Sequence, residues 1–257
     1  MILSSAQNKI IKKIISLKSK KGRYQQGQFI VEGKKPVREA ALQNKIVFLV
    51  YCPELFDLKN ELPAYMGDCY EASLSLFSKI TTLENPEGVI AVLPFEKTAF
   101  CDLVLNGDML ILDKINDPGN AGAMIRSADA FGFANILALD GCVDLYSPKC
   151  IRSSMGSFLR VNFYQASIAQ LIDYCKKETV SILGLDCNGE QLENDTSEFS
   201  KPVGLIIGSE SHGIDTNLEE VINLRIKIPM TSSIESLNAA IAGSIMMSSI
   251  YQIRKNK

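Results

Sequence analysis

The sequence predicts an α/β protein of two domains, a small mixed domain followed by a larger domain built on a parallel sheet. Two observations carry this prediction. From residue 107 to residue 257, short apolar segments alternate with helical segments, as in parallel sheets covered by helices on both faces. Residues 1–95 form a separate α/β pattern, and residues 96–106, which follow Pro94, have the composition of a linker.

The first domain is expected to begin with a helix over residues 2–19, because isoleucines recur there at helical spacing. Residues 20–28 (KKGRYQQGQ) are polar and contain two glycines, which predicts an exposed loop. The other expected elements are strands at 29–32, 46–52, 67–71 and 89–93 and helices at 34–43 and 73–79, with 53–63 irregular or a short helix.

The second domain is expected to contain six strands separated by helices. The strands are predicted at 109–113, 135–139, 159–164, 180–185, 203–208 and 225–228, and the helices at 121–131, 148–156, 168–177 and 237–254. Ser147 and Pro148 form a typical helix start, since serine caps a helix and proline fits its first turn. Residues 116–120 (NDPGN) are turn formers and predict a loop before the first of these helices.

Composition narrows the function classes. With 46% apolar and 22% charged residues the chain is an ordinary globular protein, and no apolar run reaches the roughly 18–20 residues of a membrane span. Seven scattered cysteines without a CxxC pair, and no signal-peptide pattern, favour a reduced, cytoplasmic protein. The single histidine, His212, excludes a metal site with several histidine ligands. Neither a Walker loop nor a GxGxxG motif is present.

Charge is distributed unevenly along the chain. Residues 1–38 hold ten lysines and arginines against one acid, a net charge of +9, whereas the remainder carries −11 of the total of −2. A basic arm on an acidic body suits a phosphate-bearing partner such as nucleic acid. The alternative is that these lysines form the solvated face of an amphipathic helix whose apolar stripe includes Ile11 and Ile14.

The first of three distinctive stretches is DKINDPGNAGAMIRSADAFGF, from Asp113 to Phe133. It reads as strand, loop and helix, and the loop at the carboxyl end of a strand is where open α/β sheets bind anionic or polar ligands. Arg126 is the single cationic residue between Lys114 and Lys149. Two interpretations remain open: a surface ion pair, or a guanidinium that grips a phosphate.

The second stretch is Gly204–Ile214, in which a buried strand ends in a polar turn bracketed by glycines that allow close backbone approach to a ligand. Glu210 is either an ordinary turn residue, an acceptor for a ligand hydroxyl, or the cap of a helix starting near Asp215. His212 is either incidental or an acid–base residue.

The third stretch is Ile226–Ile250, where a helix of small residues follows Asn238. This helix is expected to be either a buried core helix or one that also packs against a second subunit. Asn238 at a buried helix start requires bonding of its amide, as a cap or a ligand contact.

Together these stretches resemble the three motifs of the SpoU (TrmH-type) RNA 2′-O-ribose methyltransferases, within the SPOUT class. The matching residues are Asn120, Arg126 and Ala130-Phe131-Gly132 in the first motif, Ile207-Gly208-Ser209-Glu210 and Gly213 in the second, and Ile228-Pro229-Met230 and Ser236-Leu237-Asn238 in the third. The opening segment from Ser5 to Leu42 is similar to the substrate-binding domain joined to many family members.

The resemblance implies a trefoil knot in the C-terminal domain, a homodimer formed through that domain, S-adenosylmethionine as cofactor and no metal. The implied reaction is methyl transfer to a ribose 2′-hydroxyl of structured RNA, ribosomal RNA before transfer RNA. The implied catalytic residues are Asn120, Arg126, Glu210, Ser236 and Asn238, and the implied cofactor-binding residues are Leu185, Gly208, Ile228, Met230, Ser236 and Leu237. RNA binding is expected at Lys18, Lys20, Lys21, Arg23, Lys34 and Lys35.

Two readings from other classes stay open. The chain is alternatively a non-catalytic RNA-binding or ribosome-assembly factor of the same fold, although the matched motif residues count against it. It is otherwise an unrelated α/β enzyme for a small anionic substrate, which the basic arm disfavours.

Overall fold

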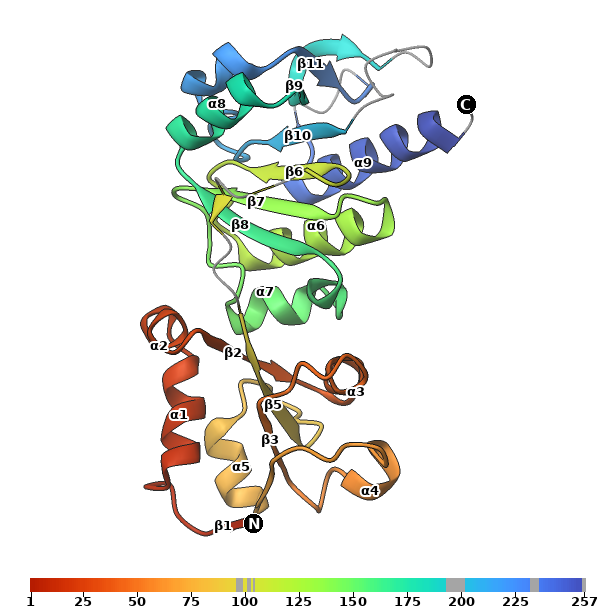
Figure 1. Cartoon of the computed structure of the whole chain (residues 1–257). Helices are drawn as coiled ribbons and strands as arrows, with labels where there is room; N and C mark the ends of the chain where they lie inside the picture. The colour runs from red at the N-terminus through yellow and green to blue at the C-terminus, as the bar shows by residue number, and fades with distance from the viewer. Residues whose placement is uncertain (96–98, 101–102, 104, 193–201, 232–235, 256–257) are drawn as a thin grey trace. The chain divides into compact units, whose positions relative to one another are not determined.

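A computed structural model of the chain describes residues 1–95, 99–100, 103, 105–192, 202–231 and 236–255 (Figure 1). The chain divides into two compact units. The first consists of Met1–Lys97 with Tyr146–Leu159, and the second of Thr98–Leu145 with Arg160–Lys257. The segment Tyr146–Leu159 therefore packs with the first unit, although in the sequence it lies between strands of the second.

The first unit is built on a five-stranded mixed sheet in the order β1-β4-β3-β5-β2. β1 and β3 run parallel to β4, whereas β5 runs antiparallel to β3 and to β2. Its strands are β1 (Ile2–Leu3), β2 (Gln28–Glu32), β3 (Phe48–Tyr51), β4 (Cys69–Ala72) and β5 (Val89–Pro94). Its helices are α1 (Lys9–Leu17), α2 (Lys20–Gln26), α3 (Lys34–Leu42), α4 (Leu58–Glu61), α5 (Leu74–Ile80) and α7 (Pro148–Ser153), with a 3₁₀ turn at Ser157–Leu159.

Helix α1 begins at Lys9, so the predicted helix over residues 2–19 is wrong in its first part. Asn8 caps the helix, because its side-chain oxygen accepts the backbone N–H of Ile10 at 2.9 Å. Residues 2–3 pair with β4 instead. The predicted amphipathic character is confirmed, since Ile11, Ile14 and Leu17 are fully buried on one face.

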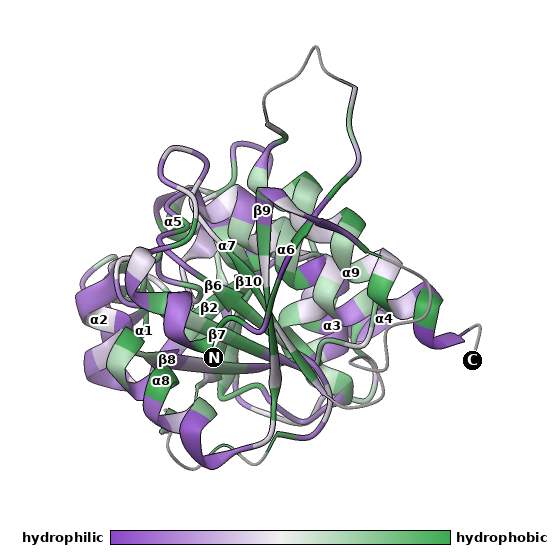
Figure 2. Cartoon of the chain, turned by 90° about the horizontal axis from the view of Figure 1, so that it is seen from above, coloured by the Kyte–Doolittle hydropathy of each residue, from purple (hydrophilic) through white to green (hydrophobic). Residues whose placement is uncertain are grey.

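Helix α2 occupies the segment that was predicted to be an exposed loop, and that prediction is wrong. Ser19 caps α2 by accepting the N–H of Gly22, and Gly27 ends it in the left-handed conformation with φ +59°. Gly22 lies in the helix because it packs against α1: a Cβ there would lie 2.0 Å from the carbonyl oxygen of Ser16. Most of α2 is hydrophilic, as its purple colour in Figure 2 shows.

The second unit is built on a six-stranded sheet in the order β11-β9-β10-β6-β7-β8, in which every neighbouring pair is parallel, as predicted. Its strands are β6 (Met109–Leu112), β7 (Asn135–Leu139), β8 (Asn162–Ala166), β9 (Ser181–Gln191), β10 (Val203–Ile207) and β11 (Leu224–Lys227). Its helices are α6 (Pro118–Ala130), α8 (Ile168–Lys177) and α9 (Ala239–Lys255), with a 3₁₀ segment at Thr216–Val221.

Successive side chains of a strand point to opposite faces of the sheet, and β6, β7 and β10 are buried at every position. Both faces of the sheet are therefore apolar, and helices cover both of them. Met109 and Ile111 of β6 share a core cluster with Leu171 of α8. On the other face, α6 and α9 lie side by side (Figure 1). Within the described part of the chain, no helix is long and apolar enough to cross a membrane.

Small residues let α9 approach the sheet closely. A Cβ on Gly243 would lie 3.3 Å from the sulfur of Met124 in α6 and 3.4 Å from Ile207 in β10. The predicted buried core helix is therefore confirmed for this side of α9. Its opposite side is exposed, with 54% of Ile241 and 40% of Ile245 accessible.

Candidate active site

Asn120 lies in the first turn of α6, which begins at Pro118 rather than at the expected Ala121. Asp117 caps the helix by accepting the backbone N–H of Asn120 at 2.8 Å, and Pro118 occupies the first helical position. The sequence Asp-Pro is thus a cap followed by a first-turn residue, and the predicted loop is partly helical. This start places Asn120 at a helix N-terminus, where the helix dipole favours negative charge.

Glu210 is presented by a tight turn after β10. Ser209 donates its N–H to the carbonyl of Gly213 at 3.1 Å, and Gly213 donates to the carbonyl of Ser209 at 2.9 Å. A Cβ on Gly208 would lie 2.2 Å from the carbonyl carbon of Gly213, so this position accepts only glycine. The close backbone approach expected of this glycine is therefore made to the turn itself.

The turn, α6 and the start of α9 meet in one hydrogen-bonded cluster around Glu210. The side-chain N–H groups of Asn120 and Asn238 donate to Glu210 Oε1 at 3.0 and 2.7 Å, and the backbone N–H of Ala239 donates to the same oxygen at 3.2 Å. Asn238 also donates to Asn120 Oδ1 at 3.2 Å. Three of the five predicted catalytic residues are thus brought together.

Asn238 and Glu210 together cap α9. The Asn238 side-chain oxygen accepts the backbone N–H groups of Ala240 at 3.0 Å and Ile241 at 3.2 Å. Glu210 therefore caps α9, not a helix near Asp215. Asn238 is exposed, so the expectation of a buried helix start is wrong, but its amide is fully engaged as that argument required.

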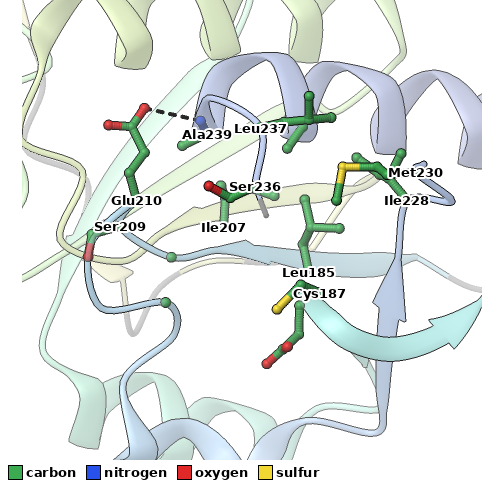
Figure 3. A pocket seen from close by; sticks show the side chains of 14 residues that line it. Leu185, Cys187, Ile207, Ser209, Glu210, Ile228, Met230, Ser236, Leu237 and Ala239 are labelled. Atoms are coloured by element: carbon green, nitrogen blue, oxygen red, sulfur yellow. Dashed lines mark hydrogen bonds between the residues drawn. The ribbon is translucent and has the colours of Figure 1, made fainter. Parts of the chain in front are cut away.

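A pocket of about 250 Å³ opens beside this cluster (Figure 3). All six residues that the resemblance assigned to the cofactor line it. They are Leu185, Gly208, Ile228, Met230, Ser236 and Leu237. Glu210 and Ala239 lie on the same wall, and Figure 3 shows the side chains of Leu185, Met230 and Leu237 around a common space. Ser236, predicted to be catalytic as well, is on this wall and not in the cluster.

Sequence reasoning assigned several other pocket residues no role. Ile207, Ser209 and Gly213 belong to the second motif but were not predicted to bind the cofactor, and Asp186, Cys187, Ala239 and Ala242 were missed. Asp186 and Cys187 line the pocket because β9 continues past residue 185 to Gln191. Asp186 forms an ion pair with Arg225 of β11, which also pairs with Glu219. For Asp186, Cys187 and Ala239 the available signal was position alone, since each lies within two residues of Leu185 or Asn238, and Ala242 had no such signal.

Arg126 is exposed on α6 and takes no part in the cluster. It follows Asn120 by six residues, about 240° around an α-helix, so the two side chains leave the helix in different directions. Within the part of the chain that the structure describes, the guanidinium has no ion pair or hydrogen bond. The neighbouring acid, Asp129, pairs with Arg160 at 2.7 Å instead. Among the described residues, the structure therefore gives no support to the interpretation of Arg126 as a surface ion pair.

The buried carboxyl group of Asp113 holds the segment that follows the Glu210 turn. Asp113, fully buried at the end of β6, accepts the backbone N–H of Asp215 through Oδ2 at 2.6 Å, and its Oδ1 has no hydrogen-bond partner among the described residues. Burial raises the pKa of this carboxyl above its ordinary value. Asp215 in turn pairs with Lys114 at 2.5 Å. The hydrogen bond from the Lys114 ammonium lowers the pKa of the Asp215 carboxyl.

His212 lies at the exposed side of the turn. Its Nδ1 is 2.7 Å from the hydroxyl of Ser211, and its backbone N–H donates to Ser209 Oγ at 3.3 Å. It lines neither the pocket nor the cluster. The structure therefore gives no support to an acid–base role for His212.

The six basic residues predicted to bind RNA differ in their solvent exposure and in their hydrogen-bond and ion-pair partners. Arg23 is buried and its guanidinium donates to the carbonyls of Leu17 and Lys18 at the end of α1. The Lys18 ammonium donates to the carbonyls of Lys79 and Thr81 at the end of α5. These two cations stabilise helix ends, so their assignment to RNA binding does not fit the structure.

The other four of these residues remain accessible to different degrees. Lys34 is partly buried and pairs with Glu61 at 3.1 Å. Lys20, Lys21 and Lys35 are exposed.

Comparisons with known proteins agree with both units. The SpoU rRNA methylase family matches residues 108–248, which is more than half of the chain. The MRM3-like substrate binding domain matches residues 8–91.

Similar proteins span nearly the whole length. The 23S rRNA (guanosine(2553)-2′-O)-methyltransferase RlmP of Bacillus subtilis (strain 168) is 31% identical over 254 residues, covering 98% of each chain. A putative RNA methyltransferase of the TrmH family from Porphyromonas gingivalis superposes with a TM-score of 0.84 at 31% identity, covering 97% of this chain and 98% of the other.

A third similar structure was solved with a ligand. The SpoU methyltransferase AviRb from Streptomyces viridochromogenes, in complex with the cofactor AdoMet, superposes with a TM-score of 0.85 at 26% identity. The superposition covers 97% of this chain and 100% of the other. Sequence, fold and motif geometry thus agree, and the chain belongs to the SpoU rRNA methylase family.

Proposed function

We propose that this protein transfers a methyl group from S-adenosylmethionine to a ribose 2′-hydroxyl of RNA, with ribosomal RNA as the favoured substrate and transfer RNA as the alternative. The observation that carries the proposal is that Glu210 belongs to two structures at once. It is the centre of the Asn120–Asn238 cluster and a wall of the pocket. A methyltransferase needs such a junction, because donor and acceptor must be aligned within one site.

The residues of the pocket fit S-adenosylmethionine. The apolar side chains of Leu185, Met230 and Leu237 suit a flat purine base, and the backbone beside Gly208 and Ile228 offers polar groups at the edge. When bound, the cofactor supplies a methyl group on a sulfonium that is already activated for transfer. The protein therefore has to position the reactants and handle one proton.

Glu210 is the candidate for handling the substrate hydroxyl. Its Oε1 is fixed by three N–H donors, whereas its Oε2 has no partner among the residues that the structure describes. A carboxylate held in this way offers Oε2 as an acceptor of fixed direction. Asn120 and Asn238 act as its positioning residues, and Ser236 at the pocket wall orients the substrate.

Arg126 is proposed to hold the phosphate of the target nucleotide. A guanidinium is always protonated in proteins, so it is a donor and not a base. Its lack of a carboxylate partner in the described chain leaves it available for a phosphate.

A homodimer is proposed through the outer face of α9. Ile241 and Ile245, four residues apart on one face of the helix, are 54% and 40% exposed, an apolar surface that a second copy would cover. Arg126 is exposed on α6, which packs beside α9, so a contact there places the arginine near the subunit boundary.

A trefoil knot is also proposed for the second unit, on the family resemblance. Its support is the path of the chain: β11 lies at the edge of the sheet beside β9, whereas α9, which follows it, packs back on β10 and α6. A return of this kind is needed for threading, although knots are rare. A cytoplasmic location is proposed as well, and the six described cysteines, all unpaired, agree with it.

Labelled methyl transfer tests the proposal. The purified protein is incubated with radiolabelled S-adenosylmethionine and, separately, with in vitro transcripts of large-subunit ribosomal RNA and of transfer RNA. We expect label in ribosomal RNA, recovered after digestion as a 2′-O-methyl nucleoside. Label in transfer RNA alone would favour the alternative substrate. Label in neither, despite cofactor binding, would favour a non-catalytic RNA-binding factor.

A further inference from the structure

A second hollow, of about 310 Å³, lies within the first unit. Four segments form its walls: the end of β2, the start of α3, residues 82–87 after α5, and α7 with the turn that follows it. We call this hollow the β2–α3 pocket. It shares no residue with the pocket beside Glu210, and no part of the proposed chemistry uses it.

The carboxylates of the β2–α3 pocket are engaged by the protein itself. Glu32 accepts the hydroxyl of Thr81 at 2.7 Å, and the backbone N–H and hydroxyl of Thr82 at 2.9 and 2.6 Å. Glu87 accepts the backbone N–H of Lys34 at 2.5 Å. These bonds fix the walls of the pocket, and within the described residues neither carboxylate forms an ion pair with Lys35 or Arg152.

The two cations of the pocket have no acidic partner. Lys35 and Arg152 are exposed, and within the described residues Arg152 donates only to the hydroxyl of Thr82, at 3.4 Å, while Lys35 has no hydrogen bond or ion pair. The nearby Lys34 and Arg38 differ, because both pair with Glu61. Two unpaired cations at one hollow attract an anion such as a phosphate.

Apart from Thr82 and Asn85, the rest of the lining is apolar. It includes Val31, Pro36, Leu83, Ile151 and Met155, and 51% of Met155 is exposed although it is a large hydrophobic residue. An apolar floor with a cationic rim matches one chemical unit of RNA, an unpaired nucleotide with its base in the hollow and its phosphate on the rim. Sequence-specific RNA recognition uses such splayed nucleotides, since bases within a duplex are not accessible.

We propose that the β2–α3 pocket binds an unpaired nucleotide of the RNA substrate, with its base against Leu83, Ile151 and Met155 and its phosphate at Lys35 and Arg152. This inference rests on the proposed RNA methyltransferase function and adds a second recognition point in the first unit. It also names Arg152, which does not belong to the basic arm, as an RNA contact. The substrate would then need an unpaired nucleotide besides the one that is methylated.

The test compares two double variants of the full-length protein. Lys35→Gln with Arg152→Gln removes both cations of the pocket. Lys9→Gln with Lys12→Gln removes the same charge from the exposed face of α1 and serves as the matched control. Affinity for an in vitro transcript of large-subunit ribosomal RNA is measured over a series of salt concentrations, and S-adenosylmethionine binding is measured by calorimetry.

We expect the pocket variant to bind the transcript about tenfold more weakly or worse, with the salt dependence reduced by about one counterion for each cation removed. Cofactor affinity should not change. In competition assays on the unmodified protein, a short single-stranded RNA should displace the transcript better than a perfect duplex of the same sequence.

The proposal is overturned if the pocket variant binds the transcript as well as the control variant does, or if the duplex competes as well as the single strand. If the unmodified protein still binds cofactor and transcript in either of these cases, the proposed methyltransferase function is not affected. Unmodified protein that binds no RNA overturns the pocket assignment together with the proposed function.

Discussion

The two carboxylate oxygens of Glu210 have different hydrogen-bonding environments. Oε1 accepts N–H groups from Asn120, Asn238 and Ala239, and this set of donors fixes the direction of the carboxylate. Oε2 has no partner within the described chain. An acceptor that is already oriented before a substrate arrives needs no reorganisation during the reaction, which is where preorganised sites gain most of their effect.

The first prediction concerns Arg126. Arg126→Ala should lower methyl transfer by about 100-fold or more, the usual effect of removing one charged donor from a reacting centre. Affinity for S-adenosylmethionine should stay the same, because the arginine does not line the pocket. Arg160→Ala is the matched control, since it removes an exposed arginine that pairs with Asp129 on the same helix. Lost cofactor binding in Arg126→Ala would contradict the phosphate role.

The second prediction concerns the buried carboxyl of Asp113. Burial raises its folded pKa above the ordinary 3.8. The stability that this group contributes is therefore fully present below pH 3.8 and is lost as the pH rises through the folded pKa. Asp113→Asn cannot titrate, so its stability relative to the unmodified protein should improve over that interval and then level off.

Urea unfolding at a series of pH values measures this difference. Asp140→Asn, which changes an exposed aspartate of the same unit, is the control. A stability difference for Asp113→Asn that is the same at every pH would show that the carboxyl is not perturbed by burial.

Helix α9 shows how one element serves both folding and the site. Its N-terminal N–H groups are satisfied by Asn238 and Glu210, so the cap of the helix is also the wall between cluster and pocket. Small residues on its inner side allow contact with α6 and β10. The same helix therefore fixes the site and exposes an apolar outer face.

The third prediction separates these two roles of Asn238. Asn238→Ala removes the cap and should lower the free energy of unfolding by about 1 kcal/mol. Asn238→Ser keeps an oxygen that can cap α9 but loses the donors to Asn120 and Glu210. We expect the serine variant to recover most of the stability while methyl transfer stays low. Recovery of both would mean that Asn238 is only a cap.

Elements with strong local signals were predictable from sequence. The buried strands β6, β7 and β10 lie close to their expected positions, and so does α8, which Ser167 starts with a capping box. α6 starts earlier than expected because Asp117-Pro118 reads equally as a turn and as a helix start. α2 was missed because Gly22, a loop former by composition, is needed for contact with Ser16 of α1.

The site was predictable only as far as motif positions reach. The cluster of Asn120, Glu210 and Asn238 joins residues far apart in sequence, and their contacts depend on how β10, α6 and α9 meet. Asp186 was not predicted to line the pocket, because the apolar pattern ends near residue 185 whereas β9 continues to Gln191. Lysine content alone did not show that Lys18 is used by a helix end.

At the scale of the whole molecule, the chain joins two units with different chemistry. The second unit holds the pocket and the Glu210 cluster, whereas the first carries the accessible lysines of residues 1–38 and the β2–α3 pocket. We expect cofactor binding and RNA binding to respond to different substitutions, because the residues for each lie in different units.

The fourth prediction concerns assembly. Ile245→Glu places a charge on the apolar outer face of α9 and should convert a dimer into a monomer, as measured by sedimentation or light scattering, with loss of methyl transfer. Leu42→Glu is the control, because Leu42 is 83% exposed in the first unit and lies outside the proposed contact. A dimer that persists in Ile245→Glu would place the subunit contact elsewhere.

The cofactor assignment depends on whether the pocket beside Glu210 holds S-adenosylmethionine, which calorimetric titration of the purified protein with S-adenosylmethionine measures. We expect saturable binding with one cofactor for each chain, and loss of that binding in Leu237→Arg, which fills the pocket, but not in Arg126→Ala. No binding to the folded, unmodified protein, or equal binding in Leu237→Arg, would contradict it.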